Sequence, residues 1–186
     1  MARTTRTSKA LGLAAVIALA AAACTGSSNA SPRDPPSTSA AHTSPAASPS
    51  PVGASAAVLA AFAGYVATVT TMSNKALVSK SWDQYAGGDA YTQGVSTVTG
   101  LRQHGYVMSG KPVASQIQVI ALDASAAPPT AQLTACWDTS KFVTASAATS
   151  RPVGGAFTTV LRVDVSEQEN NGTWRVITFA DSGSTC

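Results

Sequence analysis

Charged residues are scarce in this chain: it has 12 Lys or Arg and 9 Asp or Glu among 186 residues, or 11% of the composition. Three of the basic residues, Arg3, Arg6 and Lys9, lie at the very start, and without them the basic and acidic residues are equal in number. No run of like charge remains. This balance argues against a protein that binds nucleic acid by electrostatic attraction, so we expect no nucleic-acid partner.

Residues that bind metals or carry out hydrolysis in recognised patterns are equally few. The two histidines, His42 and His104, are far apart in the sequence. The chain has no Gly-x-Ser-x-Gly hydrolase motif and no glycine-rich phosphate loop. We therefore expect no metal site and no cofactor.

The first long apolar run, residues 11–23, is shorter than the ~20 residues that a membrane-spanning helix needs. Basic residues precede it and small residues end it, which are the parts of a signal peptide. We predict that residues 1–23 are a signal peptide. We expect no second apolar run of that length, and hence a chain that is soluble after processing apart from any attached lipid.

Cys24 directly follows this run. The arrangement resembles a bacterial lipoprotein signal, in which the cysteine becomes the new N-terminus and carries the lipid. The resemblance implies an exported protein that a lipid on Cys24 holds at the extracytoplasmic face of the cell membrane. Ala21 stands where that signal usually has leucine. Cleavage by the ordinary signal peptidase, after Ala23 or Ala30, followed by plain secretion, is therefore the alternative.

Two further cysteines, Cys136 and Cys186, are enough for one disulfide. Export would place them in an oxidising compartment. A bridge would tie the C-terminal residue to the body of the domain, where a terminal residue is otherwise hard to bury. We predict this disulfide, and two separate buried thiols are the alternative.

Residues 24–53 are rich in Ser, Pro and Ala and contain almost no large apolar side chain. Such a segment cannot bury enough surface to offset its ordering entropy, which predicts a disordered tether. Residues 54–186 have the length of one ordinary domain.

The first half of this domain has helical periodicity. Apolar residues recur at three- and four-residue steps over residues 55–73 and 89–104, with a short helical turn around Trp82 between them. The second half alternates in short segments, and Asn171-Gly172 is a hairpin signal. The predicted strands are residues 106–109, 116–122, 130–137, 142–144, 157–165 and 174–179. We expect an antiparallel meander and an α+β domain, with the N-terminal helices packed on a curved antiparallel sheet.

Several segments carry a family resemblance: residues 82–86, 100–106, 110–112, 134–140 and 172–176, and Cys186. With the two helices and the curved sheet, they resemble small actinobacterial lipoproteins with a nuclear-transport-factor-2-like domain, also called SnoaL-like, of the cystatin-like cone type. The resemblance implies a pocket between the long helix and the concave sheet. It implies no particular function, because this fold hosts isomerases, dehydratases and non-enzymatic modules.

Enzymes on this fold use an acid or base inside the cone, so the resemblance implies Asp123, Asp138 and Tyr106 as catalytic candidates. His104 and Asp83 are secondary candidates. Each has a structural interpretation as well. Asp123 lies at a strand end where a turn is expected, and Asp138 opens an expected hairpin turn. His104 lies at the predicted end of a helix, where an imidazolium can interact with free carbonyls.

We therefore predict a non-enzymatic module, tethered at the cell surface, that binds an envelope protein or a small apolar ligand. The rival hypothesis is a small pocket enzyme of the isomerase or hydratase type that uses Asp123 or Asp138 with Tyr106. A carboxylate and a Tyr or His that converge inside a closed pocket would favour the enzyme. A cone filled with apolar side chains would count against it.

Overall fold

The computed structural model describes residues 51–154 and 159–186. The predicted signal peptide, Cys24 and the tether up to residue 50 lie outside the described residues. The helices are α1 (Pro51–Lys75), α2 (Trp82–Tyr85) and α3 (Gly88–Gln103). The strands are β1 (Tyr106–Gly110), β2 (Val113–Asp123), β3 (Thr130–Asp138), β4 (Phe142–Ser146), β5 (Leu161–Asn170) and β6 (Thr173–Thr185).

Helix α1 begins at Pro51, inside the segment expected to be a tether, because proline suits the first helical turn, where its missing N–H has no partner. The segment Val52–Lys75 is by length and composition apolar enough to cross a membrane, with a mean hydropathy of 1.8. The expectation of no second apolar run is therefore wrong. The segment reaches this hydropathy mainly through its many alanine and valine residues, although it has few large apolar side chains. In the structure one face of this helix belongs to the domain core.

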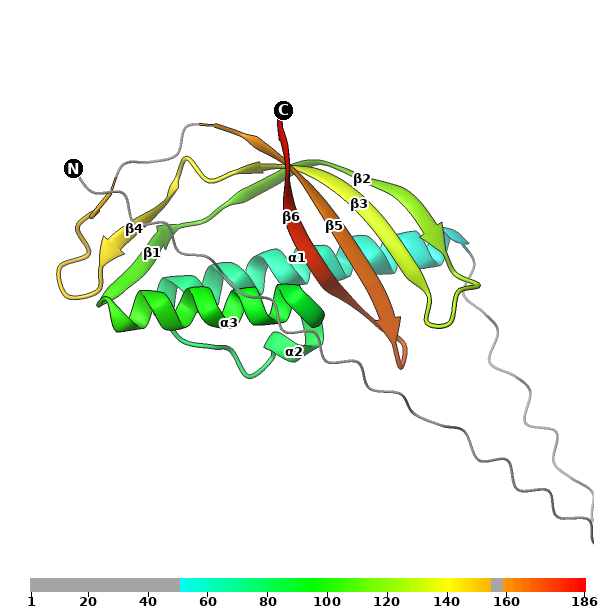
Figure 1. The fold of residues 1–186 in the computed structure, drawn as a ribbon, viewed down its shortest axis with the longest axis horizontal. Helices are drawn as coiled ribbons and strands as arrows, with labels where there is room; N and C mark the ends of the chain where they lie inside the picture. Colours follow the sequence, from blue (N-terminus) through cyan, green and yellow to red (C-terminus); the bar gives the residue numbers. More distant parts are fainter. Residues whose placement is uncertain (1–50, 155–158) are drawn as a thin grey trace, which may run out of the picture. The chain divides into compact units, whose positions relative to one another are not determined.

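The strands form two antiparallel sheets, one with the order β2-β3-β5-β6 and one with the order β1-β4. The expected meander is correct for the hairpins β2-β3 and β5-β6 but wrong for β4, which leaves β3 and pairs with β1. Figure 1 shows the reason: β1 runs on into β2, and β3 runs on into β4, so that the four segments make one long bent hairpin. The helices lie on the concave side of this bent surface (Figure 1).

The bend lies between the pairs Gly110↔Phe142 and Val113↔Asp138. Gly110 has a φ of 87°, and a Cβ there would overlap the carbonyl oxygen of Lys141, so only glycine fits. On the other strand, the Asp138 carboxylate accepts a hydrogen bond from the Ser140 N–H at 2.8 Å. Asp138 thus shapes a bend and not the hairpin turn that the sequence suggests, because the chain continues forward into β4.

Strand β5 also differs from the expectation. It begins at Leu161 and runs to Asn170, whereas the expected strand covers residues 157–165. Residues 157 and 158 of that expected strand lie outside the described residues. The polar residues after Val165 remain in the strand because β6 pairs with them as far as Asn170↔Thr173. Asn171 and Gly172 form the expected turn, with φ values of 53° and 79°.

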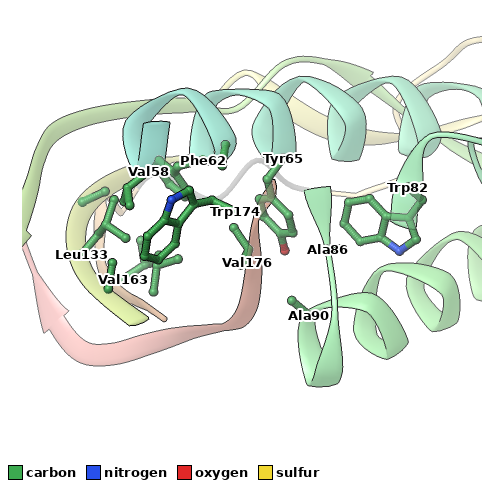
Figure 2. Close-up of a cluster of buried hydrophobic side chains, with 14 of the residues drawn as sticks. Val58, Phe62, Tyr65, Trp82, Ala86, Ala90, Leu133, Val163, Trp174 and Val176 are labelled. Atoms are coloured by element: carbon green, nitrogen blue, oxygen red, sulfur yellow. The ribbon is translucent and has the colours of Figure 1, made fainter. Parts of the chain in front are cut away.

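The core lies between the helices and the sheet. Figure 2 shows Val58, Phe62 and Tyr65 of α1 over side chains of the strands. The strand residues of this cluster include Leu133, Val163, Trp174 and Val176. This arrangement is the α+β class that the sequence predicts, with helices packed against antiparallel sheets.

A disulfide joins Cys136 of β3 to Cys186, with the Cα atoms 6.0 Å apart, which is the pairing that the sequence predicts. It closes a sequence separation of 50 residues and holds the C-terminal residue against the domain. A disulfide and an apolar helix near the N-terminus are features of an exported or membrane-associated protein.

Candidate functional site

A series of aromatic rings runs through the domain from α3 to β3. Trp82 of α2 packs between Tyr91 and Tyr65, with ring centroids 6.3 and 5.2 Å away. Tyr65 also contacts Phe179 of β6 at 5.7 Å. Phe179 in turn contacts Trp137 of β3 edge to face at 5.1 Å. The last rings of this series, Tyr65, Phe179 and Trp137, border a cavity.

Two neighbouring cavities open at the bent sheet, and one of them lies between the sheet and helices α1 and α3. The helix-side cavity, of about 220 Å³, is lined among others by Tyr65, Met72, Gln93, Thr97 and Phe179. The sheet-side cavity, of about 470 Å³, is lined by Met108, Trp137, Thr139, Phe142, Thr159 and Leu161. Since Met108, Trp137, Thr139 and Phe142 line both, the cavities adjoin. We call the two together the aromatic cleft.

The aromatic residues of α2 set how closely the helices around the cleft approach. A Cβ on Gly94 of α3 would overlap the indole of Trp82, and a Cβ on Gly64 of α1 would overlap the ring of Tyr85. The Trp82 indole N–H also donates a hydrogen bond to the Tyr91 carbonyl at 3.2 Å. Glycines that are unfavourable inside a helix are therefore needed here, because each leaves room for an aromatic ring.

The described walls of the cleft carry no charged side chain. Their polar members are hydroxyl and amide groups, among them the phenol of Tyr65. Burial raises the pKa of Tyr65 well above its ordinary range, so its hydroxyl stays protonated. The cleft is thus an uncharged, mainly aromatic and aliphatic space with hydrogen-bonding groups on the helix side, which is the composition of a small-molecule pocket.

The structure does not bring the sequence-predicted catalytic residues together. Asp123 lies at the hairpin end of β2, opposite Thr130, whereas Tyr106 pairs with Ser146 in the other sheet. Asp123 accepts hydrogen bonds from the Ser125 hydroxyl and N–H and from the Ala126 N–H, which lower its pKa. Asp123 therefore stabilises the turn that the sequence predicts at the end of this strand.

Asp138 is also engaged by its own chain segment, at the bend between β3 and β4. Hydrogen bonding from Ser140 lowers the pKa of Asp138, with a smaller contribution from the positive charge of Lys141. Trp137, the preceding residue, borders the cleft. Because neighbouring residues of a strand point to opposite faces, Asp138 faces away from the cleft.

The two secondary candidates have structural positions. His104 is the C-cap residue of α3, as the sequence indicates, and its ring stacks on Tyr106 at 6.0 Å. The Tyr106 ring is partly exposed and lines a surface depression that shares Gln93 and Thr97 with the helix-side cavity. Asp83 lies in the first turn of α2. None of these groups forms an acid–base pair inside the cleft.

Sequence reasoning missed Glu167, which is 1% exposed on the inner face of β5. It pairs across the sheet with Ala131 on one side and Val176 on the other, and neither carboxylate oxygen has a hydrogen-bond partner among the described residues. Burial raises its pKa to about 8. A signal was available: Glu167 is in phase with the inward residues Val163 and Val165, so the alternation of β5 places it in the core.

Among the described residues, no group of three or more His, Cys, Asp or Glu side chains is placed to hold a metal ion. No family model matches the chain, and no curated protein matches it. Among solved structures, the chain is similar to the intermembrane space region of the chloroplast protein ARC6, with 10% sequence identity and a TM-score of 0.42. That match covers 66% of this chain and 91% of the other.

Proposed function

We propose that this protein is an exported, lipid-anchored module that binds a small apolar ligand in the aromatic cleft. The observation that carries the proposal is the cleft itself: two adjoining cavities with aromatic and aliphatic walls, no charged lining residue in the described chain, and a volume of about 470 Å³ in the larger lobe. Pockets for drug-sized ligands fall in this range of volume and composition.

A binding role is favoured over catalysis by the placement of the acidic residues. Asp123 and Asp138 each accept hydrogen bonds from their own chain segment, and Tyr106 lines a neighbouring depression and not the cleft. General acid–base chemistry needs a proton donor or acceptor within hydrogen-bond reach of the substrate. The described cleft offers hydroxyl and amide groups that orient a ligand, but no pair of titrating groups with separate acid and base roles.

Ligand binding is tested with a neutral apolar dye, N-phenyl-1-naphthylamine, whose fluorescence rises in an apolar site. Thr97 is an exposed residue of α3 that lines the cleft, so Thr97→Phe should fill the space and raise the Kd at least about ten-fold. Ser96→Phe is the matched control, since Ser96 is equally exposed on α3 but does not line the cleft. Equal binding by both variants and the wild type would refute the assignment of the site.

Lipid anchoring is tested separately by metabolic labelling with a fatty acid. The wild-type protein should incorporate the label and fractionate with membranes, whereas Cys24→Ala should do neither, because the cysteine is the predicted site of lipidation. If the wild-type protein is unlabelled and is released into the medium, the anchoring proposal is wrong and the protein is secreted. This result would leave the ligand-binding proposal unaffected.

A further inference from the structure

We infer that the ligand of the aromatic cleft is a neutral amphiphile, an elongated apolar molecule that ends in a hydroxyl, carbonyl or amide group. This inference rests on the proposed function, because it names the class of ligand for the same site. It separates such molecules from fatty acids, amines and phosphate esters, which share the apolar body but carry a charge.

The first supporting observation is the lack of a charged partner inside the cleft. The described lining of both cavities consists of apolar, hydroxyl, thioether and amide side chains. A charged ligand group that enters such a site loses its hydration and gains no ion pair, which is costly. The nearby acidic residue Asp138 faces the other side of its strand and is already bonded to Ser140.

The second observation is an unused set of polar groups on the helix side. Tyr65 and Ser73 of α1 and Gln93 and Thr97 of α3 line the helix-side cavity, and their side chains make no hydrogen bond within the described residues. Tyr65 is 5% exposed, so its hydroxyl has little access to water from elsewhere. These groups can donate to and accept from a hydroxyl, a carbonyl or an amide.

The two lobes then have different roles. The helix-side cavity, about 220 Å³, supplies the unbonded polar groups and suits the polar end of the ligand. The sheet-side cavity, about 470 Å³, is walled by Met108, Trp137, Phe142 and Leu161 and suits the apolar body. Flat rings and a polarisable thioether pack well against an unsaturated chain or ring.

The experiment compares retinol with retinoic acid, which have the same unsaturated body and differ in the polar end. The protein used is the chain without the predicted signal peptide, with Cys24→Ala so that it carries no lipid and needs no detergent. It is titrated with each molecule near pH 7.5, and quenching of tryptophan fluorescence reports binding. Retinol should bind at least about ten-fold more tightly than retinoic acid, because only the acid carries a charge into the cleft. Below the acid's own pKa the two affinities should converge.

A variant pair locates the polar end. Tyr65→Phe keeps the ring and removes the hydroxyl, and it should weaken retinol binding about five-fold, as expected for one hydrogen bond. Tyr85→Phe is the control, since Tyr85 packs on Gly64 and does not line the cleft.

Equal or tighter binding of retinoic acid at pH 7.5 would overturn the inference while leaving the cleft as an apolar binding site. Binding of the naphthylamine dye with no binding of either retinoid would overturn the inferred elongated body. If neither the dye nor the retinoids bind, the proposed function itself fails.

Discussion

The indole of Trp82 lies directly against the backbone of Gly94, in the space that a side chain at position 94 would occupy. Trp82 is 1% exposed and belongs to the aromatic series that leads to the cleft. The contact therefore links the stability of the domain to the position of α3, which forms one wall of the proposed site.

Replacement of Gly94 by alanine should destabilise the domain by about 1–3 kcal/mol, because the new methyl group overlaps a large ring that has no room to move. Gly100→Ala is the matched control on the same helix: a Cβ there meets nothing within 4 Å, so the better helix propensity of alanine should stabilise the domain by up to ~1 kcal/mol. Urea unfolding measures both. Similar free energies of unfolding for the two variants would contradict the packing described.

Replacement of Gly110 by alanine should cost at least about 3 kcal/mol, because it combines an unfavourable positive φ with overlap on the Lys141 carbonyl. Gly105→Ala separates these effects. Gly105 has a φ of 68° but open space around its Cβ position, so it should lose only about 1 kcal/mol. Thermal and urea unfolding of both variants test the close contact at the bend. Equal losses in the free energy of unfolding would contradict it.

The buried carboxyl of Glu167 should make the domain less stable as the pH rises. Its pKa is raised from 4.5 to about 8 on folding, so between these values the unfolded chain releases a proton that the folded chain keeps. The free energy of unfolding should fall by on the order of 3 kcal/mol between pH 5 and pH 7.5, and the loss is complete only above pH 8.

Glu167→Gln should remove most of this slope and make the protein more stable than the wild type at pH 7.5, since the amide carries no charge to desolvate. Glu169→Gln, two residues further along β5, should retain the slope because Glu167 is intact. Urea unfolding across the pH range measures all three proteins. A wild-type stability that rises over this range would show that Glu167 is paired or exposed.

Reduction of the disulfide should lower the free energy of unfolding by about 4 kcal/mol, the chain-entropy estimate for a loop closed over 50 residues. Cys186→Ser should reproduce this loss, since Cys186 is exposed and its removal takes away little packing. Added reductant should lower the melting temperature of the wild type and leave that of Cys186→Ser unchanged. Free thiols in the oxidised wild-type protein would refute the pairing.

The extent of the helices and strands could be predicted where local chemistry decides them. The apolar stripe of residues 55–73, the stop at His104 and the Asn171-Gly172 turn each depend on side chains close together in the sequence, and the structure has them near the expected places. The end of β5 could not be predicted in this way, because its polar residues stay extended only through their pairing with β6.

The candidate site was less predictable. Asp123 and Asp138 are catalytic candidates in the sequence because they are carboxylates near strand ends, but the Oδ1 atom of each accepts hydrogen bonds from neighbouring N–H groups. Trp137 and Tyr65 lie 72 positions apart, and only the folding of α1 over the bent sheet places both beside one cavity. No local sequence pattern predicts the orientation of side chains around such a bend.

The sequence alone predicts the α+β class, the Cys136–Cys186 pairing and the hairpin turn. The class follows from the periodicity of apolar residues and the turn from the local preference of Asn-Gly. The pairing follows from the small number of cysteines. The tertiary structure alone decides that β4 pairs with β1 and that a cleft opens between α1, α3 and the strands. These features depend on the direction in which the chain bends at Gly110, and that direction is set by contacts between residues distant in sequence.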